Sequence, residues 1–420
     1  MWKTKLEDMN RVIILGNGFD LAHNLKTKYE HFINWYWDNW YKKIHRSSNL
    51  YEKDDLCEIR VKGNCLSSYF YFYYKDGNKY EQIKDVVKEY EISFIRSPLL
   101  ERISESIETK GWVDIEADYY AMLVECKGKK DELEKLNKDF AVIQDLLVEY
   151  LDEIQKHKIN EELVCEEIKN AILSPVLKRD MAVSSIIEWW GFVEDRLKTE
   201  GAELTKILAP YVDAWHMHIV LQDIQNFARK NLERIIMYKL EPVHWPDYFL
   251  VPDRIMLLNF NYTKTADLYL PKSGRFLVNH IHGELSKSET VIFGYGDESD
   301  DEYKKLQKIN DNEYLRHIKT NRYLETPNYR DLLAFIDSAP FQVCIMGHSC
   351  GLSDKTLLNT LFEHRNCVSI KPYYYVNEQG KDNYLDIVQN ISRNFTNPQL
   401  MRDRVVNKTY CSPLPQKGKE

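Results

Sequence analysis

The chain has 420 residues, 44% of them hydrophobic, and its 57 Lys and Arg against 65 Asp and Glu give a net charge of −8. At roughly 150 residues per domain, this length predicts two or three folded units, and the composition excludes a disordered chain and a coiled-coil rod. The acidic balance argues against nucleic acid as the main partner, because binding to a phosphate backbone needs a basic surface.

The sequence also bears on the compartment. No apolar stretch approaches the roughly 20 residues of a membrane span, and the first residues lack the apolar region of a secretion signal. The eight cysteines contain no CxxC pair, which favours reduced thiols over a disulfide framework or a zinc site. We therefore expect a cytoplasmic protein with no membrane partner.

Strand and helix patterns alternate in the two flanks of the chain. A continuous apolar run predicts a first strand at Val12–Leu15, followed by a helix at 21–40. Further strands are predicted at Arg254–Leu258, Phe276–Ile281, Thr290–Phe293, Phe341–Met346 and Ser369–Val376, with helices at 303–318, 353–364 and 383–394. Continuous apolar strands between helices predict an α/β fold with a parallel sheet.

The middle of the chain is different. Only three glycines occur between Trp112 and Ser273, and apolar residues recur at helical spacing over 131–155, 181–198 and 202–240. Residues 50–97 fit neither pattern, and we interpret the aromatic run at 69–74 as strand packing because no Arg interleaves it. We predict one α/β domain from 9–40 plus 250–400, a mainly helical insertion at 41–249, and a tail at 401–420 that is frayed from Pro413 onward.

Five predicted strands run into turns rich in glycine and polar residues. In an open α/β sheet, ligands bind beyond the carboxyl ends of the strands. The turns are Gly16–Asp20, Asn259–Thr263, His280–Glu284, Gly294–Glu298 and Gly347–Asp354. The sequence therefore predicts that these five turns line one pocket.

The first turn suits a nucleotide. Gly16 and Gly18 let the backbone approach a phosphate, and the following helix directs its amides there, although a tight turn explains the glycines as well. Leu21 stands where a dinucleotide fingerprint has its third glycine, which disfavours a hydride-transferring enzyme. Asp20 is either a ligand contact or the N-cap of the helix.

Candidate catalytic groups follow the later strands. His282 precedes a glycine at a strand end, where a ring can act as a general base, whereas a lone histidine is more often structural. His280 shares a strand face with it, but no carboxylate or cysteine at typical spacing completes a metal site, so we expect no metal. Asn261 can hold a ribose hydroxyl or a water, or else form the turn, and Asn259 competes for that role.

Three features have alternative interpretations. Ser349 and Asp354 either contact a ligand or cap the helix at 353–364. Gly347–Gly351 also resembles the GxSxG elbow of α/β-hydrolases, with Ser349 as nucleophile. Asp114 and Glu116 are two residues apart, so on a helix they diverge and paired acid–base chemistry is not expected.

The string Val12–His23, VIILGNGFDLAH, followed by Leu25, Thr27 and Tyr29, resembles the opening of the AbiH family of phage abortive-infection proteins. Later landmarks stand in the order of that family, namely Trp112–Glu116, Asn259–Thr263, His280–Gly283 and Gly347–Asp354. The resemblance spans about 12–365 and implies antiphage defence, with a phage-derived trigger as a partner.

The same order resembles, more distantly, the sirtuin-like NAD-consuming domains of bacterial defence, and this implies a Rossmann-like parallel sheet assembled from both flanks. By this resemblance Asn261 would hold the nicotinamide ribose or the attacking water, and His282 would be the catalytic base. The pyrophosphate would lie on Gly16, Asn17, Gly18, Phe19 and Asp20, and the adenosine side on the turn that includes Gly347, His348, Ser349 and Asp354. Thr263 stands where that pattern has Asp.

These observations lead to one expected function and two alternatives. We expect an antiphage effector that binds NAD or a related nucleotide and hydrolyses its nicotinamide–ribose bond without a metal. The first alternative is a defence module that senses a nucleotide or binds a partner without turnover, and the second is a hydrolase that uses Ser349. A homo-oligomer is compatible with each.

Overall fold

The computed structural model describes residues 9–71, 76–110, 113–185, 249–250, 252–269 and 274–418. The chain forms two compact units. Unit 1 comprises residues 1–24, 160–282 and 326–420, and unit 2 comprises residues 25–159 and 283–325. The predicted helices at 181–198 and 202–240 lie almost wholly outside the described residues, and the predicted domain bounds stay a prediction.

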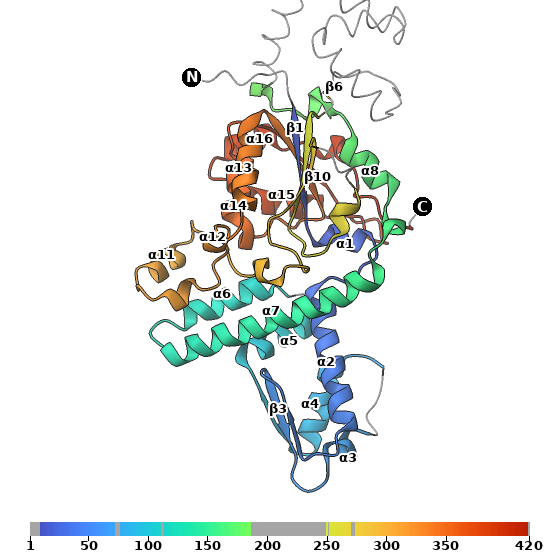
Figure 1. Cartoon of the computed structure of the whole chain (residues 1–420), viewed down its shortest axis with the longest axis vertical. Helices are drawn as coiled ribbons and strands as arrows, with labels where there is room; N and C mark the ends of the chain where they lie inside the picture. The colour runs from blue at the N-terminus through green and yellow to red at the C-terminus, as the bar shows by residue number, and fades with distance from the viewer. Residues whose placement is uncertain are drawn as a thin grey trace, which may run out of the picture. The chain divides into compact units, whose positions relative to one another are not determined.

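Unit 1 is built on a five-stranded parallel sheet (Figure 1). Its spatial order is β10-β9-β1-β7-β8, and the same order read from the β8 edge, with the five strands numbered along the chain, is 3-2-1-4-5. The strands are β1 (Asn10–Leu15), β7 (Arg254–Asn259), β8 (Phe276–His280), β9 (Phe341–Met346) and β10 (Cys367–Tyr373). The order reverses between β1 and β9, and such a switch point is where open α/β sheets bind their ligands.

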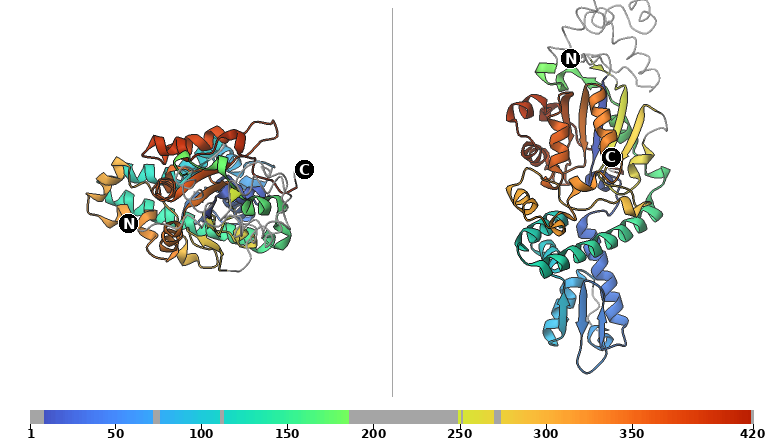
Figure 2. Two further views of the ribbon diagram at one scale, coloured as in Figure 1. Left: turned by 90° about the horizontal axis from the view of Figure 1, so that it is seen from above. Right: turned by 60° about the vertical axis from the view of Figure 1, so that its left-hand side comes forward.

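Helices cover both faces of this sheet (Figure 2). Ile13 and Leu15 of β1 pack in one apolar cluster with Ile168 and Ile172 of α8, so α8 covers one face. The helices of unit 1 are α1 (Asn17–Ala22), α8 (Glu166–Leu173), α13 (Asn328–Ser338), α14 (Lys355–Phe362), α15 (Tyr384–Arg393) and α16 (Pro398–Arg404). Short 3-10 turns and the pair β5 (Val176–Leu177) with β6 (Phe249–Leu250) complete the described part.

Unit 2 is mainly helical and carries a small antiparallel sheet. Its helices are α2 (Tyr29–Arg46), α3 (Leu66–Phe70), α4 (Lys79–Glu89), α5 (Pro98–Lys110), α6 (Ile115–Glu125), α7 (Lys130–Lys158), α11 (Asp301–Gln307) and α12 (Lys319–Arg322). The sheet joins β2 (Tyr51–Lys53), β3 (Cys57–Arg60) and β4 (Ser93–Arg96). The stripe predicted over 131–155 is confirmed by α7, which buries Leu133, Phe140 and Leu147.

A buried ion pair helps to hold unit 2 together. The Lys319 ammonium lies 3.0 Å from Oε1 of Glu116, and the two side chains are 1% and 8% exposed. The same oxygen accepts the N–H of Gly294 at 3.1 Å. Asp114 caps α6 by accepting the Ala117 N–H, so the two carboxylates of the Trp112–Glu116 motif have separate structural roles.

The predicted strand at Thr290–Phe293 is wrong. Ser288–Thr290 forms a 3-10 turn and residues 291–293 pair with no described strand. The side chains of Val291, Ile292 and Phe293 are buried, and Phe293 stacks on Phe140 with ring centroids 4.7 Å apart. Since a short apolar run looks alike in a buried strand and a buried loop, its sequence could not distinguish them.

Two predicted helices and the tail also differ. The helix predicted at 21–40 is split into α1 and α2, with Asn24 in the left-handed region at φ 59°. That predicted at 303–318 is α11 followed by a 3-10 turn at Asn312–Leu315. The tail is not frayed at Leu414, which is buried and donates its N–H to the Tyr374 carbonyl at 2.8 Å.

All eight cysteines are free thiols. Among the described residues, none of the helices combines the length and the hydropathy of a bilayer span.

Candidate functional site

The loops after β1 and β9 meet at the switch point of the unit 1 sheet. The Gly16 N–H donates to the Met346 carbonyl at 3.2 Å, and the Gly18 N–H donates to the Gly347 carbonyl at 2.8 Å. A Cβ at Gly18 would lie 2.7 Å from the Gly347 Cα, and one at Gly347, whose φ is +76°, would lie 2.1 Å from the Phe19 nitrogen. The glycines predicted here are therefore needed for the close approach of two loops.

Asp20 does not cap α1, so this interpretation is wrong. Gly16 holds the N-cap position and Asp20 lies inside the helix, 1% exposed. Its Oδ2 accepts the Thr263 hydroxyl at 2.7 Å, and its Oδ1 has no partner among the described residues. Burial raises the pKa of Asp20 to about 6, and the Thr263 hydroxyl opposes the rise.

The loop after β7 is tied to the first turn through Asn261. Its side-chain amide donates to the Gly16 carbonyl at 3.0 Å. The turn itself is closed by Asn259, whose Oδ1 accepts the Asn261 N–H at 3.1 Å and whose amide donates to the Thr263 carbonyl at 3.1 Å. Asn259 is therefore the residue that closes the turn, and Asn261 ties this turn to Gly16.

His282, two residues after β8, and His348, after β9, share one carboxylate. Nε2 of His282 lies 3.3 Å from Oδ1 of Asp354, and Nε2 of His348 lies 3.5 Å from Oδ2. His348 accepts the Cys350 N–H on Nδ1 at 2.9 Å, so its proton is on Nε2, toward Asp354. The ring of Phe260 stands edge-on to both imidazoles, with centroids 4.9 Å and 4.3 Å away.

This cluster is buried. His282, His348 and Asp354 are 4%, 6% and 7% exposed. Asp354 occupies the N-cap position of α14 but makes no side-chain capping bond, so the capping interpretation is wrong for it. A carboxylate that holds one nitrogen of a histidine orients the ring and stabilises its protonated form, which is the arrangement of a general base.

The loop after β9 does not have the geometry of a hydrolase elbow. Such an elbow places the nucleophile on the strained turn between strand and helix. Here the positive φ of 55° is at Cys350, whereas Ser349 is exposed and its carbonyl accepts the Asn390 amide at 2.8 Å. In this structure Ser349 is therefore not placed as that nucleophile would be.

His280 does not act with His282. Its Nδ1 lies 3.1 Å from the Asn259 amide, and its Nε2 lies 3.1 Å from Oδ2 of Asp267. Each histidine of the pair thus has its own carboxylate, and the described residues contain no cluster of three or more His, Cys, Asp or Glu side chains that could hold a metal.

Of the five predicted turns, the first, second and fifth belong to unit 1, as do His280 and His282 of the third. The fourth turn, Gly294–Glu298, belongs to unit 2, where Gly294 contacts Glu116. Sequence reasoning missed Thr263 as the partner of Asp20, and it missed Asp354 as the shared partner of two histidines. Neither pairing leaves a pattern in the chain, because each joins residues far apart.

A family model matches most of the chain. The family described as bacteriophage abortive infection AbiH matches residues 12–375. The chain belongs to the AbiH family. The AbiH match spans both units and includes every candidate site residue described above, at the carboxyl ends of the unit 1 strands. Searches of curated proteins and of solved structures returned no significant match to this AbiH chain.

Proposed function

We propose that this AbiH protein is an antiphage effector that binds NAD or a related nucleotide at the carboxyl edge of the unit 1 sheet and hydrolyses the nicotinamide–ribose bond. Membership of the AbiH family supports the defence role. The observation that carries the chemistry is the pair formed by His282, in the loop after β8, and Asp354, at the start of α14. The strand order 3-2-1-4-5 supports a Rossmann-like, sirtuin-like nucleotide domain.

The reaction assigns a role to each group. The oxygen of a water forms a bond to C1′ of the ribose, and the C1′–N bond breaks with both electrons passing to nicotinamide, which leaves as a neutral molecule. His282 takes the proton of the water, and Asp354 stabilises the resulting imidazolium.

The remaining residues would hold the ligand. Asn261 would position the ribose hydroxyl or the water, and the loop Gly16–Asp20 would hold the pyrophosphate. The loop Gly347–Asp354, with His348 and Ser349, would receive the adenosine side.

For the ligand to bind, the loops after β1 and β9 have to separate. The Gly18 N–H is already bonded to the Gly347 carbonyl, and the Phe19 N–H donates to the Gly16 carbonyl at 2.8 Å. His282 is only 4% exposed. A closed site of this kind fits an effector that turns over NAD only after a phage-derived trigger separates the two loops.

The test is nicotinamide release from NAD by the full-length chain, with and without an extract of phage-infected cells as the source of trigger. We expect triggered wild type to release nicotinamide and His282→Ala and Asp354→Asn to be slower by about 100-fold or more. His364→Ala is a matched control, because Nε2 of His364 lies 3.4 Å from Asp337 at the other end of the sheet. Equal release by wild type and His282→Ala would refute the role of His282.

A second candidate function is a nucleotide-sensing or partner-binding module without turnover. It is favoured by the burial of His282, His348 and Asp354. Recovery of unchanged, stoichiometric nucleotide from the triggered protein would support it against the enzyme. Loss of defence in His282→Ala with full defence in Ser349→Ala would remove the Ser349 hydrolase.

A further inference from the structure

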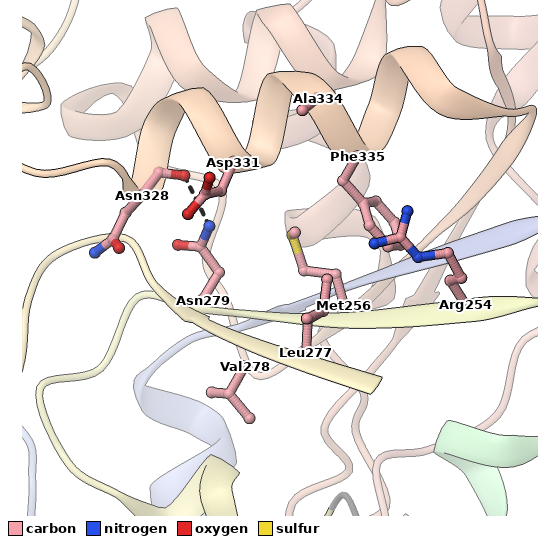
Figure 3. Close-up of a pocket in the computed structure, with 9 residues that line it drawn as sticks. All are labelled: Arg254, Met256, Leu277, Val278, Asn279, Asn328, Asp331, Ala334 and Phe335. Carbon is pink, nitrogen blue, oxygen red and sulfur yellow. Dashed lines mark hydrogen bonds between the residues drawn. The ribbon is translucent and has the colours of Figure 1, made fainter. Parts of the chain in front are cut away.

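A cavity of about 390 Å³ lies in unit 1 between α13 and the strands β7 and β8 (Figure 3). This volume is within the range of small-molecule sites. The lining residues are Arg254, Met256, Leu277, Val278, Asn279, Asn328, Asp331, Ala334 and Phe335. We call it the α13 cleft. None of its residues belongs to the candidate site at the carboxyl edge, so an inference about it does not depend on the proposed function.

The middle of the α13 cleft is apolar. Met256 of β7 and Leu277 of β8 are register partners and form its floor. On α13, Phe335 is buried and Ala334 is exposed, so a small side chain stands where a larger one would fill the space. The floor and the small residue leave room for a flat apolar body.

One end of the α13 cleft is cationic. Figure 3 shows the guanidinium of Arg254 over the ring of Phe335. The guanidinium carbon lies 5.0 Å from the ring centroid. Arg254 is partly exposed, and among the described residues no carboxylate forms an ion pair with it. A guanidinium held on an aromatic ring presents its donors in a fixed plane, which suits the oxygens of a phosphate or a carboxylate.

The other end offers acceptors. Asp331 is exposed and lies one turn of α13 before Phe335. Asn279 donates its amide to the Asn328 carbonyl at 2.8 Å, whereas its Oδ1 is buried without a partner among the described residues. An acceptor left unpaired in a protein interior costs about 1–3 kcal/mol, which a donor on a ligand would recover.

The two ends are separated by a length typical of a mononucleotide. Asn279 is the register partner of Leu258, four residues along β7 from Arg254, which at about 3.3 Å per residue corresponds to roughly 13 Å. We propose that the α13 cleft binds a nucleoside monophosphate, with its phosphate on Arg254, its base over Met256 and Leu277, and an N–H of the base edge at Asp331 and Asn279. Guanosine monophosphate has such N–H groups on its base edge.

The test is calorimetric titration of the full-length chain with guanosine monophosphate and with guanosine. We expect one nucleotide per chain, and about tenfold or more weaker binding of guanosine, because a hydrogen bond to a charged group is worth about 1.5–3 kcal/mol. Arg254→Gln should remove the difference between the two ligands. Equal affinity of wild type for both ligands, or no binding of millimolar nucleotide, would overturn the proposal.

A second pair of variants places the ligand. Ala334→Trp fills the α13 cleft from an exposed position and should abolish binding, whereas Arg330→Trp, an exposed position of α13 outside the lining, should leave it unchanged. The melting temperature of each variant checks that it is folded. Retained binding in folded Ala334→Trp would show that the nucleotide binds elsewhere and would refute the site.

Discussion

The buried carboxyl group of Asp20 makes the stability of unit 1 depend on pH in a predictable direction. Its pKa is about 6 in the folded chain against an ordinary value of 3.8. One pKa unit corresponds to about 1.4 kcal/mol, so ionised Asp20 costs the folded unit about 3 kcal/mol at pH 7. Between pH 3.8 and 6 the folded state binds more protons than the unfolded state. Stability is therefore lost as pH rises through this window, and the loss is complete above it.

Asp20→Asn removes this charge at every pH. The free energy of unfolding of the variant, relative to wild type, should rise by about 2–3 kcal/mol between pH 4 and pH 7 and then stay constant. The new amide nitrogen has no acceptor at the position of Oδ1, which adds a cost that does not vary with pH. The expected signature is therefore a change with pH in the difference between the unfolding free energies of variant and wild type. The size of that difference at any single pH is not part of the prediction.

Amide hydrogen exchange of β1 and β9 measures this quantity, because amides in the central strands exchange through opening of the whole unit. Rates between pH 4.5 and 7.5 are corrected for the intrinsic pH dependence of exchange. Thr263→Val should lose more unfolding free energy than wild type as pH rises, since it removes the hydroxyl that lowers the pKa of Asp20. If the difference in unfolding free energy between wild type and Asp20→Asn did not change across this pH range, the reasoning would be refuted.

Three further predictions concern packing and charge. Gly347→Ala should destabilise unit 1 by more than about 2 kcal/mol in urea unfolding, because Gly347 has a positive φ and its Cβ would clash with the Phe19 backbone. Gly351→Ala is the control, because its Cβ would meet only the Ser349 hydroxyl at 3.6 Å. Its unfolding free energy should stay within about 0.5 kcal/mol of wild type. Lys319→Met should destabilise unit 2 by about 3–5 kcal/mol, because it removes the cation that pairs with the buried Glu116 carboxylate. Adding Glu116→Leu should recover part of this loss of stability. A double variant no more stable than Lys319→Met would contradict the prediction. Burial lowers the pKa of His317 from 6.5 to about 4. The unfolding free energy of unit 2 should therefore fall by about 3 kcal/mol as pH decreases from 6.5 to 4. His317→Phe should abolish this contribution to the pH dependence, as measured by tryptophan fluorescence during unfolding.

The sequence predicts the sheet well because its strands are continuous apolar runs that end at glycine or polar turns. Val12–Leu15 and Phe341–Met346 lie within β1 and β9 as the structure has them. The same criterion fails at Thr290–Phe293, where the apolar run packs against Phe140 in unit 2 without any strand partner. Burial alone therefore does not identify a strand.

The candidate site was predictable only in its parts. The turns that carry His282 and Asp354 follow from strand ends, but their pairing depends on the order of strands in space, which the chain does not reveal. The role of Asp20 was missed because Gly16 takes the N-cap and shifts the carboxyl into the helix. The α13 cleft has no sequence motif, since Arg254 and Asp331 line the same cavity only because a helix packs on two strands.

The position of β1 in the sheet has a consequence for biosynthesis. This strand lies between β7 and β9, and its residues pair with partners that are 244 positions later in β7 and further still in β9. At a translation rate of about 5–20 residues per second, the ribosome needs roughly 12–50 seconds to make the first of these neighbours. During that interval the string Val12–Leu15 is a nascent hydrophobic strand with both edges unpaired, so yield in the cell should depend on chaperones that shield it until β7 and β9 emerge.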